Sequence, residues 1–130
     1  LALLNILVSR PEIHWQPELP DQLINLTRFI DQNVNRKIPN QLLASQAGIS
    51  VEGVFRLFNK HLGTSPAHYV NQVRIRNASQ LLSQHSHTID EVAELLGFPN
   101  RAYFSRVFKQ ITGMSPGAFR SSKTRMQAVR

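Results

Sequence analysis

The chain of 130 residues contains no cysteine, which excludes a disulfide framework, a thiolate metal site and a cysteine nucleophile within it. No apolar run approaches the ~18–20 consecutive residues of a membrane span, so we expect no membrane partner and a cytoplasmic location. The apolar opening at residues 1–8 lacks preceding basic residues and a small-residue cleavage site, so no signal peptide is predicted. Because the first residue is Leu1, we expect a fragment of a longer protein.

The sequence also lacks the residue patterns that carry catalysis. It contains no Ser/His/Asp arrangement, no paired carboxylates and no phosphate-cradling glycine loop. The nearest approach to a metal motif is His85-x-His87, which lies in a polar stretch without a third ligand nearby. We therefore expect no enzyme activity, no cofactor and no metal site.

Acidic residues are few, and the resulting net charge of +7 is unevenly placed. Residues 1–40 hold four basic and four acidic side chains, which cancel. From residue 41 onward, eleven Lys and Arg stand against four Asp and Glu and supply the whole excess. A basic excess confined to one portion predicts a face that binds a polyanion, most often nucleic acid. The alternative is a basic surface that only keeps the protein soluble.

Three of the seven prolines fall within residues 11–20. Each proline fixes its own φ and moves the preceding residue out of the helical region, so this segment is predicted to be an extended connector. We interpret residues 1–20 as the tail of an upstream domain plus a linker.

Apolar residues at helical spacing dominate the remainder, and capping signals divide it into helices. Asn40 and Ser50 are expected N-caps, Ser65-Pro66 begins a long helix, and T-I-D-E at 88–91 is a capping box. The expected helices cover about residues 21–34, 41–47, 51–62, 66–83, 89–96 and 101–111, with a last turn from Pro116. Two helices joined by a short turn that contains glycine form the helix-turn-helix pattern.

The helix-turn-helix pattern occurs twice in the chain. Positions fifty residues apart match, in the pairs Arg56 with Arg106, Phe58 with Phe108, Gly63 with Gly113, Ser65 with Ser115, Pro66 with Pro116 and Tyr69 with Phe119. Between Gly48 and Gly97 the offset is forty-nine, so the second turn is one residue longer. A duplicated plan of this kind is not expected of a single enzyme pocket.

The motifs of both copies closely resemble those of a known family. They read A-G-I-S, F-R-L-F-x-K and G-T-S-P in the first copy, and I-D-E-V-A-x-x-L-G-F, Y-F-S-R-V-F-K and G-M-S-P-x-x-F-R in the second. Over about residues 21–120 they resemble the DNA-binding region of the AraC/XylS family of bacterial transcription regulators. The second copy is the more diagnostic half.

The resemblance implies an all-α fold of about seven helices, in which a long central helix joins two helix-turn-helix lobes. The double helix-turn-helix domain would cover 21–120, with lobe one at 21–65, the joining helix at 66–84 and lobe two at 85–120, followed by a frayed basic tail at 121–130. The implied function is sequence-specific binding of double-stranded DNA by a transcription regulator. RNA polymerase is an implied second partner, and a dimer would form through the missing N-terminal region.

In the second recognition helix, Phe104, Val107 and Phe108 have core spacing, which leaves the opposite face for DNA. Arginine suits bidentate contact with guanine, worth about 1–3 kcal/mol of discrimination. By resemblance, the positions that match base-contacting residues of the family are Arg101, Ala102, Ser105 and Arg106. The alternative for Arg106 is contact with phosphate or with its own helix end only.

The sequence predicts the base contacts of the first recognition helix less clearly than those of the second. Its apolar stripe points inward, which leaves Val51, Glu52, Phe55 and Arg56 on the outer face. Glu52 either accepts from cytosine N4 or weakens binding near phosphates, and Phe55 contacts either thymine methyls or its own lobe. Phe55 departs from the polar residue usual in the family. Gly53 also departs, at a cost of roughly 1 kcal/mol against alanine.

Phosphate contacts are expected from helix N-termini, whose free amides suit anions, and from long cationic side chains. The expected residues are Ser50, Lys60, Arg74, Arg76, Asn100, Tyr103 and Lys109. For Tyr103 the alternative is packing at the edge of the lobe. For the cations the alternative is a solvated surface charge.

The length of the joining helix constrains how DNA is bound. About eighteen residues would span about 27 Å, less than the ~34 Å of one turn of DNA. Both recognition helices would then engage fully only if the DNA bends or one lobe sits loosely. Two other functions stay open, namely a non-specific architectural DNA binder and a helical protein-interaction module that docks an acidic partner.

Overall fold

The computed structural model describes residues 19–129, which form seven α-helices and no strand. The helices are α2 (Asp21–Gln32), α3 (Asn40–Ala47), α4 (Val51–Leu62), α5 (Pro66–Gln84), α6 (Ile89–Leu95), α7 (Arg101–Thr112) and α8 (Pro116–Val129). The predicted all-α architecture is confirmed. The upstream tail and linker predicted at 1–20 lie almost entirely outside the described residues.

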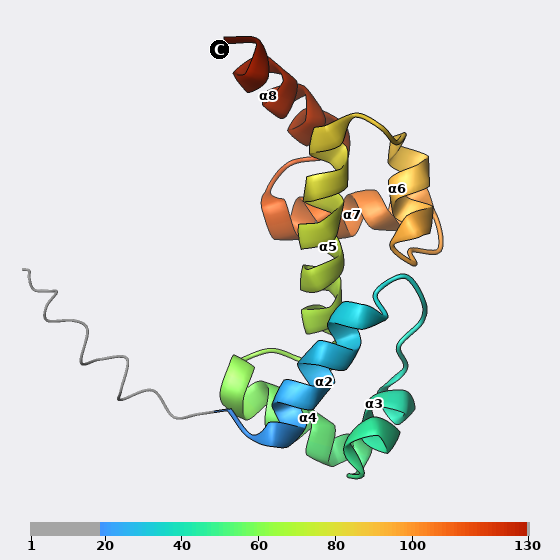
Figure 1. Ribbon diagram of the computed structural model, residues 1–130, viewed down its shortest axis with the longest axis vertical. Coiled ribbons are helices and arrows are strands. Elements are labelled where there is room, and N and C mark those ends of the chain that lie inside the picture. Colours follow the sequence, from blue (N-terminus) through green and yellow to red (C-terminus); the bar gives the residue numbers. More distant parts are fainter. Residues whose placement is uncertain (1–18, 130) are drawn as a thin grey trace, which may run out of the picture.

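Helix α5 is the axis of the molecule. It has 19 residues, and Figure 1 shows α2, α3 and α4 grouped around its beginning, with α6, α7 and α8 around its second half. It packs against α4 in lobe one and against α6, α7 and α8 in lobe two. Both recognition helices, α4 and α7, therefore pack against the same central helix.

The two lobes repeat the same aromatic contact. In lobe one the rings of Phe58 and Tyr69 meet edge to face, with centroids 5.6 Å apart. In lobe two Phe108 and Phe119 meet in the same way at 5.4 Å. These are two of the pairs that the fifty-residue offset predicts, so the sequence repeat is also a repeat of packing. Such T-shaped contacts add to the stability that burial of the rings provides.

The predicted caps hold at most helix starts. The side chains of Ser50, Ser65, Thr88 and Asn100 each accept a backbone N–H of the first turn of their helices. The prediction for Asn40 is wrong, because Pro39 occupies the N-cap position and no side chain caps α3.

The C-terminal segment departs from the prediction of a frayed tail, because α8 continues as helix to Val129. Near its start, Arg120 donates to the carbonyl oxygens of Leu82, at 3.1 Å, and of His87. One turn later the Thr124 hydroxyl lies 2.9 Å from Nε2 of His85. These contacts attach the first turns of α8 to the end of α5 and the loop after it, and they support the helix beyond residue 120.

Candidate nucleic-acid interface

In the second recognition helix, the positions predicted to point outward are accessible. Oδ1 of Asn100 accepts the Tyr103 amide at 2.8 Å and starts α7. The apolar stripe of Phe104, Val107 and Phe108 is buried. The remaining positions lie on the other side of the helix, where Arg101, Ala102 and Arg106 are exposed and Ser105 is half-buried. All four predicted base-contacting positions of this helix are therefore accessible.

Tyr103 lies at the edge of lobe two and supports Arg106. Its half-buried ring stands 6.0 Å from the buried Phe98 ring. The Arg106 guanidinium carbon lies 5.6 Å from the centre of the Tyr103 ring, a distance at which a cation and an aromatic face attract. The contact restricts the Arg106 side chain without covering it.

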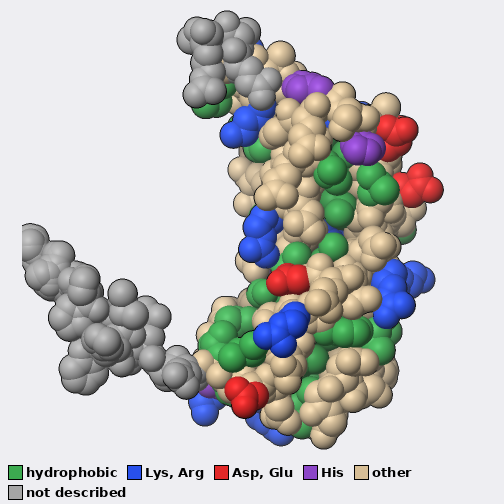
Figure 2. Space-filling view, viewed as in Figure 1, with side chains coloured by type: hydrophobic (Ala, Val, Ile, Leu, Met, Phe, Trp, Pro, Cys, Tyr) green, Lys and Arg blue, Asp and Glu red, His purple; other side chains and the backbone are tan. Residues whose placement is uncertain are grey.

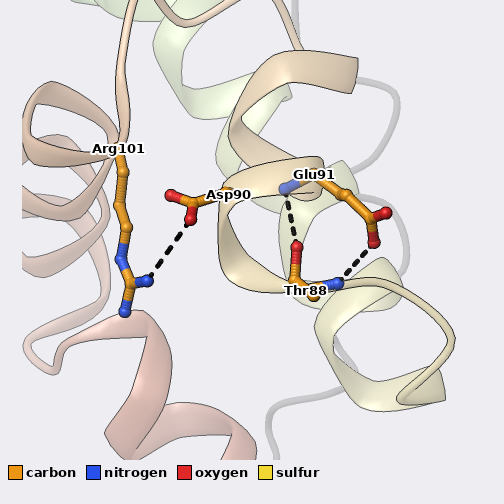
Figure 3. Close-up of polar contacts among 4 residues, drawn as sticks. All are labelled: Thr88, Asp90, Glu91 and Arg101. Carbon is orange, nitrogen blue, oxygen red and sulfur yellow. Dashed lines mark hydrogen bonds and ion pairs between the residues drawn. The ribbon is translucent and has the colours of Figure 1, made fainter.

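Arg101 has an acidic neighbour that the sequence did not indicate. Its Nη1 lies 3.7 Å from Oδ2 of Asp90, and the two side chains are 56% and 69% exposed. In Figure 3, Asp90 points from α6 toward Arg101, while Thr88 and Glu91 form the reciprocal capping box beside it. The T-I-D-E motif predicted the box. It contained no signal that its third residue would meet a side chain of the next helix.

The first recognition helix has the same plan with a less regular surface. Val54 and Phe58 are fully buried, and Glu52 and Arg56 are exposed. Val51 and Phe55 are half-buried, and Val51 packs against the core. Fewer of the predicted base-contacting residues are therefore exposed on α4 than on α7.

The close neighbours of residue 53 explain why a glycine fits within this helix. A Cβ at this position would lie 3.3 Å from both Cδ1 of Ile49 and Oγ of Ser50. Ser50 is the cap of α4 and accepts the Gly53 amide at 3.0 Å. A Cβ would therefore require Ile49 Cδ1 and the cap oxygen of Ser50 to shift slightly, whereas glycine leaves the cap in place.

The structure places one predicted phosphate-contacting residue in the interior. Arg74 is only 9% exposed, and its guanidinium donates to the carbonyl oxygens of Val34 at 3.0 Å and Arg36 at 2.7 Å. Burial lowers the pKa of Arg74, and the nearby Tyr103 opposes this shift. The prediction of a phosphate contact at Arg74 is corrected, because it required a side chain on the surface.

The other predicted phosphate-contacting residues lie on or near the surface. Tyr103 is half-buried, and the exposed members are Ser50, Lys60, Arg76, Asn100 and Lys109. In Figure 2 the basic side chains on the visible face are spread over both lobes and form no single continuous patch. The basic side chains of this face therefore do not by themselves outline an interface.

The part of the chain that the structure describes has neither a metal site nor a membrane span. Residues 19–129 hold no group of three His, Cys, Asp or Glu side chains placed to bind a metal ion. None of their helices is both long and apolar enough to cross a membrane.

Two helix-turn-helix units packed on one central helix place the chain among the helix-turn-helix proteins. Similarity to known proteins identifies the family. A family model described as a helix-turn-helix domain matches residues 43–122. The probable transcriptional regulator LumQ of Photobacterium leiognathi is 31% identical over 94 residues, which are 72% of this chain and 38% of LumQ.

Solved structures agree with the family assignment. A transcriptional regulator with an AraC-type DNA-binding domain from Chromobacterium violaceum superimposes with a TM-score of 0.74 at 26% identity, over 78% of this chain and 91% of that one. The DNA-binding domain of AdpA, solved with a target DNA, gives 0.78 at 24% identity, over 84% and 98% of the two chains, which shows a shared fold.

The chain belongs to the AraC-type helix-turn-helix family of DNA-binding domains. The resemblance drawn from its motifs is confirmed. The chain spans little more than a third of the length of LumQ.

Proposed function

We propose that α4 and α7 enter successive major-groove segments on one face of double-stranded DNA, and that α7 carries most of the base readout. The observation that carries this is the equivalence of Arg56 and Arg106. They occupy matching positions of the repeat, both are exposed, and both helices pack on α5. Arginine at such positions can bind guanine O6 and N7.

The proposed contacts follow from the exposure of each side chain. The base-contacting set is Arg56, Arg101, Ala102, Ser105 and Arg106, with Val51, Glu52 and Phe55 at the edge of the α4 face. The phosphate-contacting set is Ser50, Lys60, Arg76, Asn100, Tyr103 and Lys109. Ser50 and Asn100 stand at helix N-termini, where the helix dipole favours an anion. The proposal is for binding without catalysis.

Selection of bound sequences from random DNA tests the proposal. We expect an enriched motif of two halves about one helical turn apart, with the stronger base preference in one half. Affinity for the selected site should exceed affinity for random DNA by at least about a thousandfold. A ratio near one would make the chain an architectural binder. No DNA affinity at any salt concentration would favour a protein-docking module.

For the whole protein we propose two further properties, which follow from the resemblance of its motifs to the family. RNA polymerase would be a second partner, and a region outside this chain would form a dimer. Transcription with purified polymerase from a promoter carrying the selected site tests the first. Equilibrium sedimentation of the longer protein and of this chain tests the second, with a dimer expected only for the longer form.

A further inference from the structure

Arg74 connects the central helix to the backbone of lobe one. It lies on α5, and its Nε and Nη2 donate to two carbonyl oxygens, of Val34 and Arg36, in the segment that follows α2. Because the guanidinium is planar, two such bonds fix its orientation as well as its distance. A buried cation without these acceptors would be costly, so the contact depends on the placement of this segment.

The same side chain also faces lobe two. The guanidinium carbon of Arg74 lies 5.5 Å from the centre of the Phe98 ring, which belongs to the turn between α6 and α7. Beside it, Gly97 has a φ of +79°, and a Cβ there would lie 3.1 Å from the Val34 carbonyl oxygen. The turn of lobe two and Arg74 therefore meet the same short stretch of lobe-one backbone.

The contact continues to the recognition helix of lobe two. Phe98 stands against Tyr103, and Tyr103 stands beneath Arg106. Arg74 and Tyr103 also line an open cleft of about 520 Å³, whose walls include Lys37 from lobe one and Pro99 from lobe two. Arg74 lies where the two lobes meet, and it is the only charged side chain that is buried among residues 19–126.

We propose that Arg74 is a positioning residue that sets the distance and rotation between α4 and α7, so that the protein accepts two DNA half-sites at one spacing only. This rests on the proposed function, since it assumes that both helices read DNA. Adding one base pair between half-sites moves them apart by about 3.4 Å and rotates one by about 34°. Two lobes in a fixed relative orientation cannot match that shift and rotation, whereas two lobes that move relative to each other can.

The lobe contact can be tested with a charge-preserving change, Arg74→Lys, and a matched control, Arg120→Lys. Lysine keeps the positive charge and loses the planar fork that reaches two carbonyls. Arg120 makes the same kind of bidentate contact, to Leu82 and His87, but both acceptors lie in α5 and the loop after it, away from lobe one. The control therefore loosens lobe two without touching the lobe junction.

The measurement is affinity for the selected site and for sites with one base pair inserted or removed between its halves. For the wild type and Arg120→Lys we expect a loss of about tenfold or more, the size of a base-pair mismatch. For Arg74→Lys the loss should be less than about threefold, with unchanged base preference inside each half. The proposal is overturned if Arg74→Lys loses as much affinity on the altered spacings as the wild type does. It is also overturned if Arg120→Lys loses as little affinity as Arg74→Lys.

Two further measurements keep the test decisive. If Arg74→Lys does not fold, Phe98→Leu removes the ring that Arg74 covers and should relax the spacing in the same way. Residual dipolar couplings of the DNA-free protein should fit one alignment tensor for both lobes in the wild type and two in the variants. If random DNA yields no motif, the proposed function fails, while one tensor in all forms refutes the lock independently.

Discussion

The guanidinium of Arg101, the first residue of α7, is held 3.7 Å from the carboxylate of Asp90 in α6. Arg101 is also one of the proposed base-contacting residues. If Arg101 contacts DNA as proposed, DNA and Asp90 compete for the same cation, and the Asp90 carboxylate also repels nearby phosphates.

Replacing Asp90 with asparagine should raise DNA affinity about 1.5- to 5-fold, in the range of an exposed ion pair. The change frees Arg101 and removes a repulsion from phosphate. The control Glu94→Gln removes another exposed acid of α6, for which the described residues provide no ion pair. Fluorescence anisotropy at two salt concentrations measures both. An equal gain in the control would show that only net charge matters.

Replacing Arg106 with alanine should reduce the preference at one or two base pairs by about 1–3 kcal/mol and leave the other positions unchanged. A randomised site library measures this. The control Lys109→Ala should weaken all sequences alike and reduce the salt slope by about 0.9. A uniform loss in Arg106→Ala would identify Arg106 as a phosphate contact.

Replacing Gly97 with alanine should lower the thermal unfolding midpoint more than the same change at Gly48. Both glycines have positive φ, at +79° and +68°, so both substitutions carry the left-handed penalty of about 1–2 kcal/mol. Only Gly97 has backbone atoms of Val34 and Arg36 within 3.3 Å of the added carbon, whereas Gly48 has nothing within 4 Å. Calorimetry measures both midpoints.

Each extra kcal/mol at Gly97 should appear as about 4–8 °C in a domain of this size class. Valine at Gly97 adds a branched side chain and should unfold lobe two. Equal midpoints for the two alanine variants would contradict the close approach of the lobes.

Replacing Thr88 with alanine should cost about 0.5–2 kcal/mol of unfolding free energy. Thr88 accepts the Glu91 amide at 3.1 Å, and its own amide donates to Glu91 at 2.8 Å. Thr88→Ser keeps the hydroxyl and should stay near the wild type. Urea titrations measure both, and an equal loss in the two variants would argue against the cap.

Most helices could be predicted because their signals are local. Caps such as Ser50 and Thr88 act within one turn of their own helix, and the fifty-residue repeat marks the same helix boundaries in both lobes. The prediction of Asn40 as an N-cap was wrong because α3 begins at Asn40 itself, so that Pro39 is the N-cap residue. The continuation of α8 was missed because it depends on Arg120 meeting the end of α5, which lies 38 residues earlier.

The outward face of α7 could be predicted from the sequence alone, since helical periodicity separates Phe104 and Phe108 from Arg101 and Arg106 whatever the surroundings. The role of Arg74 did not. A cation on an amphipathic helix looks the same in sequence whether it faces phosphate or two carbonyls of another lobe. Folding decided between them, because it brought Val34 and Arg36 to Arg74 across about forty residues and supplied the acceptors that a buried guanidinium requires.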